Sequence, residues 1–251
     1  MNTVVMALLV ALVVTSCKVD STVTIAVSED GSGTVEVVVD ADAEAAKQIG
    51  DPATSLRLAD LTEAGWTVAK PRIDAKSGEL HLKAIRPFRS AEELKAIVAD
   101  IGTGTTAPFI SDLRLTVKDS FGRTDYRLTG RLKTDGGVAS LSDPALAEEL
   151  GGLPVGRTPE EMAAMGWDGK GVGTLRLRVQ LPGGVDEHNG TVVDGQVEWS
   201  APVGSDDVTD KRMVIESESI QRRVQLARVL GFAGIGAAIA LVVVGLIRRS
   251  R

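Results

Sequence analysis

The only cysteine of the chain lies at position 17, at the end of Val14-Thr15-Ser16-Cys17. This tetrapeptide has the pattern of a lipobox, and it closes an apolar run that begins at Val4. A run of about eleven residues is too short to cross a bilayer but has the length of a signal-peptide core. The pattern predicts a signal peptide at residues 1–16 and a lipid, such as palmitate, on the Cys17 thiol. The alternative is a buried strand with an ordinary core cysteine.

A second apolar run occupies residues 229–247 and is followed by Arg248, Arg249 and Arg251. At about 1.5 Å per residue, these nineteen residues would form a helix of about 28 Å, close to the hydrocarbon thickness of a bilayer. We therefore expect one transmembrane helix, with residues 222–228 as a basic juxtamembrane segment and residues 248–251 as a cytoplasmic tail. Because the signal peptide exports the N-terminus, residues 17–221 are expected on the extracytoplasmic face of the cell membrane.

The charge balance limits the classes of partner. Six arginines and no acid lie from Arg222 onward, so removing them from the net charge of −6 leaves −12 for residues 1–221. A body this acidic is not a nucleic-acid binder, and it needs its anchors to stay near an anionic bilayer. Aromatic residues make up only 3% of the chain, which argues against stacking platforms for bases.

The residues that most often catalyse reactions or hold metals are scarce. With one cysteine and two histidines, His81 and His188, far apart in the sequence, neither a cysteine cluster nor a histidine-rich metal site is expected. No serine nucleophile elbow, zinc-protease motif or phosphate-binding loop is present. His81 falls on the polar side of an alternating run. The sequence therefore predicts no catalytic residue, no metal and no cofactor, and a protein that is not an enzyme.

Alternating polar and apolar residues predict strands in several places. The pairs 18–27 with 34–39, and 113–118 with 126–133, are expected to form hairpins, and further strands are expected at 175–181, 196–200 and 213–217. Ser90 and Glu93 form a capping box at the start of an amphipathic helix, Ser90–Ile101, and 41–50 and 55–64 are weaker helical stretches. The predicted class is α+β: a curved, mainly antiparallel sheet packed on one strong and a few short helices, plus the C-terminal transmembrane helix.

Three of these strands place basic residues on their outward sides. Apolar side chains at Leu113 to Val117, Tyr126 to Leu132 and Leu175 to Leu181 should point inward. Seven of the ten residues between them are basic, including Arg114, Lys118, Arg127, Arg131, Arg176 and Arg178. If the strands were neighbours, they would form one cationic face suited to an anionic headgroup or an acidic partner. The alternative is cross-strand pairing with Asp112, Asp119, Asp125, Glu198 or Glu216.

Phe121 stands at the predicted hairpin turn between Ser120 and Gly122, where a large apolar side chain is unusual. Two explanations remain open. Either the strand begins one residue early and Phe121 belongs to the core, or Phe121 guards a cavity mouth or touches lipid.

The sequence resembles the LppM family of actinobacterial lipoproteins in three stretches. These are Cys17-Lys-Val-Asp-Ser-Thr-Val-Thr-Ile25, Phe121-Gly-Arg-Thr-Asp-Tyr-Arg-Leu-Thr-Gly130, and Leu181-Pro-Gly-Gly-Val185 followed by Asn189-Gly190 and Val197-Glu-Trp199. The resemblance implies a membrane-anchored envelope domain that binds a lipid or glycolipid, such as a phosphatidylinositol mannoside. It carries no catalytic residues over to this chain.

Two functions follow from these observations. The first is a lipid- or glycolipid-binding lipoprotein, in which the sheet curves around helix 90–101 and leaves an aliphatic cavity. The second is a structural or interaction lipoprotein that docks on another envelope protein without a ligand.

Overall fold

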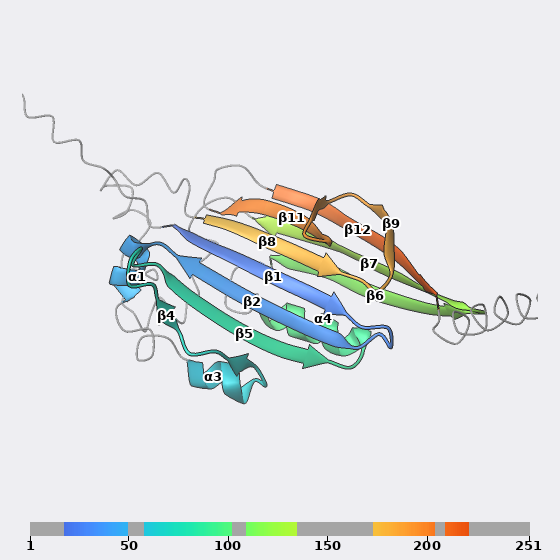
Figure 1. The fold of residues 1–251 in the computed structure, drawn as a ribbon, viewed down its shortest axis with the longest axis horizontal. Coiled ribbons are helices and arrows are strands. Elements are labelled where there is room, and N and C mark those ends of the chain that lie inside the picture. The colour runs from blue at the N-terminus through green and yellow to red at the C-terminus, as the bar shows by residue number, and fades with distance from the viewer. Residues whose placement is uncertain (1–17, 50–57, 102–108, 135–172, 204–208, 221–251) are drawn as a thin grey trace, which may run out of the picture.

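The computed structural model describes residues 18–49, 58–101, 109–134, 173–203 and 209–220. In these ranges the chain forms twelve strands and three helices, so the fold is predominantly β (Figure 1). The predicted α+β class is wrong. The two weaker helical stretches give only α1 (Ala43–Ile49) and α3 (Leu58–Glu63), and the alternating runs pair into two sheets rather than one.

The larger sheet contains eight strands and is called the first sheet below. Its long strands are β1 (Val19–Val27), β2 (Gly33–Ala41), β5 (Leu80–Phe88), β8 (Gly173–Gln180) and β11 (Gln196–Val203). The order is β10-β11-β8-β1-β2-β5-β3, with the short strands β10 (Thr191–Val193) and β3 (Thr67–Val68) at the edges and β4 (Arg72–Ile73) also paired with β5. Strands β1 and β8 are parallel, although about 150 residues separate them, and the other pairs are antiparallel.

The second sheet contains four antiparallel strands in the order β6-β7-β12-β9. These are β6 (Ile110–Ser120), β7 (Arg123–Thr134), β12 (Thr209–Ile220) and β9 (Gly184–His188). Strand β6 lies at one edge and carries a bulge near Asp112, which has a φ of 53°. The chain passes from the first sheet to the second between β8 and β9, and returns between β9 and β10.

The two sheets share one aliphatic core. Figure 1 shows the first sheet in front, the second sheet behind its upper part, and α4 (Ala91–Ile101) behind β2 and β5. The capping box is confirmed, because the Glu93 amide donates to Ser90 Oγ at 3.2 Å and the Arg89 amide donates to Glu93 Oε2 at 2.8 Å. Leu94, Ile97 and Val98 of this helix are buried in the core.

The predicted inward side chains are confirmed with one exception. Leu113, Leu115, Tyr126, Leu128 and Leu132 are buried on the second sheet, and Leu175, Leu177, Val179 and Leu181 are buried on the first. Val117 is 37% exposed, because it belongs to the exposed end of β6 that leads into the β6–β7 turn.

Both predicted anchors lie outside the described residues, as do residues 1–16, 222–228 and 248–251. The longest described helix, α4, has eleven residues, and none in the described ranges combines the length and apolar character needed to cross a membrane. For the described residues, the predicted fold is therefore corrected to a two-sheet β fold without a membrane-spanning helix.

Candidate functional site

The six predicted cations do not form one face. Strand β8 pairs with β1 and β11 in the first sheet, whereas β6 and β7 belong to the second. The prediction of a single cationic surface over three neighbouring strands is wrong, because alternation assigns a side chain to a face but does not say which sheet the strand joins. The outer face of the first sheet holds Arg176 and Arg178, and the outer face of the second holds Arg114, Lys118, Arg127 and Arg131.

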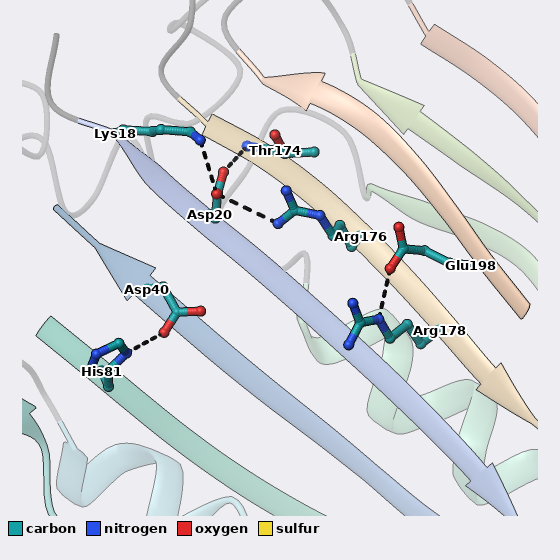
Figure 2. Close-up of polar contacts among 8 residues, drawn as sticks. All are labelled: Lys18, Asp20, Asp40, His81, Thr174, Arg176, Arg178 and Glu198. Atoms are coloured by element: carbon teal, nitrogen blue, oxygen red, sulfur yellow. Dashed lines mark hydrogen bonds and ion pairs between the residues drawn. The ribbon is translucent and has the colours of Figure 1, made fainter. Parts of the chain in front are cut away.

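On the first sheet, Arg178 and Arg176 are both paired with acids (Figure 2). Arg178 donates from Nε to Glu198 Oε2 at 2.7 Å, on the neighbouring strand β11. Arg176 lies 3.6 Å from Asp20 Oδ2 across the parallel β1–β8 pair. For Arg178 the structure therefore has the cross-strand pairing with Glu198 that the sequence left as the alternative.

Asp20 joins the starts of β1 and β8. Its carboxylate accepts the Thr174 amide at 2.8 Å and lies 3.2 Å from Lys18 Nζ (Figure 2). Burial of Asp20 acts to raise its pKa, but the hydrogen bonds from Lys18 and Thr174 and the charge of Arg176 together hold the pKa below its ordinary value. This carboxylate is a structural acceptor that holds the parallel strand pair in register.

Two further polar contacts on this face join neighbouring strands. His81 Nδ1 lies 2.6 Å from Asp40 Oδ1, and Lys83 Nζ lies 2.8 Å from Glu36 Oε2. His81 is exposed, as its polar position predicted. Within the described residues, no group of histidine, cysteine and acidic side chains has the spacing to hold a metal ion. Most of the charged side chains on this face therefore have a polar partner on a neighbouring strand, and no described helix covers the face (Figure 1).

On the second sheet, the two cations of β7 are paired with β12. Arg127 lies 2.6 Å from Glu216, as one of the predicted pairings. Arg131 forms a two-point contact with Asp210, from Nε at 3.0 Å and from Nη2 at 2.5 Å. The hydrogen bond from Arg131 lowers the pKa of Asp210, and the same bond raises the pKa of Arg131.

Arg114 and Lys118 differ from these four cations. Both are exposed on β6, the edge strand, and neither forms an ion pair or side-chain hydrogen bond with any residue in the described ranges. In register, Arg114 is opposite Thr129, and Lys118 is opposite Asp125, whose carboxylate lies 3.5 Å from Arg123 instead. Within the predicted set, the cations left available to an external anion are therefore concentrated on β6.

Phe121 is 103% exposed, so its assignment to the core is wrong. It forms the tip of the β6–β7 hairpin together with Gly122, whose φ of 84° suits a residue without a side chain. Arg114, Lys118 and Phe121 thus lie along one strand and its turn.

The space beneath the first sheet is packed with side chains. Leu94 and Ile97 of α4, and Leu128 and Ile215 of the second sheet, have no exposed surface. A hollow of about 500 Å³ opens instead beside the β1–β2 hairpin, and its mixed lining includes Ser28, Ser32, Thr34, Arg89 and Gln180. The geometry thus favours contact at the surface over enclosure of a lipid beside α4.

The glycines of the third resemblance stretch have structural roles that the sequence analysis missed. A Cβ on Gly183 would lie 2.0 Å from the Glu218 carbonyl oxygen, where the chain crosses between the sheets. A Cβ on Gly190 would lie 2.6 Å from Val197 and 2.8 Å from the Trp199 ring. The sequence signal was present, since adjacent glycines between two strands indicate close backbone approach.

The N-terminal side of the body is fixed close to Cys17. Strand β1 begins two residues after the cysteine. The Lys18 amide donates to Asp42 Oδ2 at 2.8 Å, and the Asp42 amide donates back to the Lys18 carbonyl at 2.9 Å. A group attached at Cys17 therefore has almost no spacer between itself and the sheet.

Comparison with family models, with curated proteins and with solved structures finds no match.

Proposed function

We propose that this protein is a cell-envelope lipoprotein, attached to the membrane through a lipid on Cys17, whose two-sheet body binds anionic headgroups of lipids or glycolipids. The body lies on the extracytoplasmic face, and its role is binding rather than catalysis. The observation that carries the proposal is that Arg114 and Lys118 have no ion-pair partner among the described residues, whereas the other four predicted cations are each matched to an acid.

The short connection to Cys17 supports this role. Because β1 begins at Val19 and Lys18 is already held by Asp42, an acylated Cys17 would keep the body against the bilayer surface. Headgroups would then be at high local concentration for any cation on the side of the body.

The lipid and the cations would contribute very different free energies to membrane binding. A basic side chain near an anionic surface contributes about 1 kcal/mol, and each buried methylene of an acyl chain contributes about 0.8 kcal/mol. Two cations on an acidic body cannot hold it on a membrane alone. We expect the lipid on Cys17 to supply attachment, and Arg114 and Lys118 to select among headgroups. Resemblance to the LppM family suggests phosphatidylinositol-based glycolipids as the class.

A second candidate is docking on another envelope protein without a ligand. The observation that favours it is the outer face of the first sheet. Strands β11, β8, β1, β2 and β5 present paired charges there (Figure 2), and no described helix covers them (Figure 1). Paired charges fit a flat polar protein interface better than a headgroup, which needs free donors.

The two candidates differ in lipid selectivity. We would place the full-length acylated protein in nanodiscs of equal phosphatidylcholine and phosphatidylinositol, and count retained lipids by native mass spectrometry. Headgroup binding predicts several-fold enrichment of phosphatidylinositol, which the double variant Arg114→Glu, Lys118→Glu should remove. The matched control is Arg72→Glu, Lys95→Glu, which makes the same charge change at two exposed residues elsewhere. Enrichment that survives the first pair, or that is absent in the wild type, would favour docking on a protein.

A further inference from the structure

Phe121 is an exception among the aromatic residues that the structure describes. The other five aromatic side chains in the described ranges are buried or half-buried: Trp66, Phe88, Phe109, Tyr126 and Trp199. The chain has only eight aromatic residues in all, so a fully exposed one is a notable loss of potential core. The Phe121 ring is not buried by folding, so its whole apolar surface is available for an external contact.

The hairpin holds Phe121 away from the body. Ser120 is paired with Arg123 and Asp119 with Thr124, which leaves Phe121 and Gly122 as a two-residue turn. Thr124 Oγ1 donates to Asp119 Oδ1 at 2.8 Å and ties the two strands just behind the tip. In Figure 1 this hairpin projects past the end of the first sheet. The aromatic ring is therefore carried on a supported arm rather than on a free loop.

The surroundings of the tip are amphipathic. Lys118 and Arg123 flank Phe121 and are exposed. Arg123 also lies 3.2 Å from Glu218 and 3.5 Å from Asp125, so Lys118 is the flanking cation without an acidic partner among the described residues. Ile220, which is opposite Arg123 on β12, is 37% exposed. An apolar apex with basic flanks matches the interface of a bilayer, where rings enter the headgroup region and long cations stay at its surface.

The two ends of the body lie apart. Strand β1 begins at the left of Figure 1, and the β6–β7 hairpin ends at the right. The nine residues of β1 cover about 30 Å at about 3.3 Å each. A body standing upright on Cys17 would thus hold Phe121 about this far or farther from the bilayer, and a body lying lengthwise would bring it to the surface.

We propose that Phe121 inserts into the bilayer interface as a second membrane contact, so that the body lies lengthwise on the membrane with β6 toward the headgroups. This inference rests on the proposed lipid attachment at Cys17. It also explains why Arg114 and Lys118, which have no acidic partner in the part of the chain that the structure describes, occupy the strand that leads to the tip. The partner is a lipid surface; another protein or a second copy of the chain would require the ring to be covered by side chains instead.

The test uses full-length acylated protein in phosphatidylcholine vesicles, with and without phosphatidylglycerol. Phe121→Cys adds the only free thiol, because Cys17 is the single cysteine of the chain and its sulfur is consumed by acylation. A nitrobenzoxadiazole label on this thiol reports the polarity around it. Val192→Cys is the matched control, since Val192 is also an exposed apolar residue, at 54%, on the edge strand β10. Circular dichroism checks that both labelled proteins are folded.

Insertion predicts a blue-shifted, several-fold brighter label at position 121, quenched by lipids that carry a nitroxide on the acyl chain, and a water-like label at position 192. A water-like label at 121 on protein that still floats with the vesicles would overturn the insertion and leave the lipid attachment intact. Failure to float would instead contradict the attachment. A blue shift that depends on protein concentration and resists the lipid quencher would show that a second copy covers the ring, which also overturns the proposal.

Discussion

The indole N–H of Trp199 donates a 3.0 Å hydrogen bond to the side-chain oxygen of Asn189. The same oxygen accepts the Val214 amide at 2.9 Å, and Asn189 Nδ2 donates to the Arg212 carbonyl at 2.8 Å. Trp199 belongs to β11 of the first sheet, whereas Arg212 and Val214 belong to β12 of the second. A single side chain at the crossover between β9 and β10 therefore joins the two sheets.

Replacing Asn189 with alanine should destabilise the fold. The change leaves the buried Trp199 N–H without its partner, which costs about 1–3 kcal/mol, and removes two further bonds to β12. We expect a loss of about 2–4 kcal/mol in the free energy of unfolding, measured by denaturant titration of the full chain in detergent. Thr191→Ala, at an exposed position two residues away, should change it by less than about 0.5 kcal/mol. Equal effects of the two changes would mean that the Asn189 bonds contribute little.

The adjacent glycines Gly183 and Gly184, at the crossover between β8 and β9, should respond very differently to substitution by alanine. Gly183 has a φ of 79°, and its Cβ would lie 2.0 Å from the Glu218 carbonyl oxygen, whereas nothing lies within 4 Å of a Cβ on Gly184. Gly183→Ala should therefore shift β8 or β12 and cost about 3 kcal/mol or more. Gly184→Ala should be near neutral. Thermal unfolding of both variants checks this, and a Gly183→Ala protein that melts with the wild type would show that the crossover adjusts freely.

The chain has one tyrosine, so its ionisation can be followed without interference. Tyr126 is buried and donates from its hydroxyl to the Glu29 carbonyl at 2.6 Å, joining the second sheet to the β1–β2 hairpin. Burial raises the pKa of this phenol above its ordinary value of 10.0, and the nearby acids Glu29 and Asp119 act in the same direction.

The folded state favours the neutral form of the Tyr126 phenol, and this sets how stability changes with pH. The contribution of Tyr126 to stability is fully present below pH 10.0, the ordinary value, and is lost as the pH rises through the higher folded value. Absorbance at alkaline pH should show a tyrosine that titrates later in folded than in unfolded protein. Tyr126→Phe should cost about 1–2 kcal/mol at neutral pH, a difference that shrinks at high pH. A phenol that titrates at its ordinary pH in the folded protein would contradict this account.

Local features of the fold were predictable, and long-range ones were not. The β1–β2 and β6–β7 hairpins and the cap at Ser90 followed from neighbouring residues, because alternation and capping act over a few positions. The parallel pairing of β1 with β8 leaves no such local signal. As a result, Arg176 and Arg178 were expected beside Arg127, although they lie in the other sheet.

The candidate site was also predicted only in part. Glu198 and Glu216 were named as acids for cross-strand pairing, and each has an arginine within 3 Å. The roles of Asp20 and Asp210 were missed, because both acids sit on strands whose partners could be known only from the sheet order. Asn189 was noted only as part of a resemblance. Its importance follows from Trp199, a buried residue whose N–H requires an acceptor.

The final prediction concerns Cys17, on which the proposed attachment depends. Replacing it with serine removes the thiol that would carry the lipid but keeps the size of the side chain nearly unchanged. We expect wild-type protein to incorporate a palmitate analogue in cells and Cys17→Ser to lose it completely, together with normal removal of residues 1–16. Ser16→Ala serves as the control, because a small residue before the cysteine should preserve both cleavage and labelling. Mass spectrometry of the N-terminal peptide checks each outcome. Label that persists in Cys17→Ser would mean that another residue carries the lipid, and the body would then no longer be tied to the membrane at the start of β1.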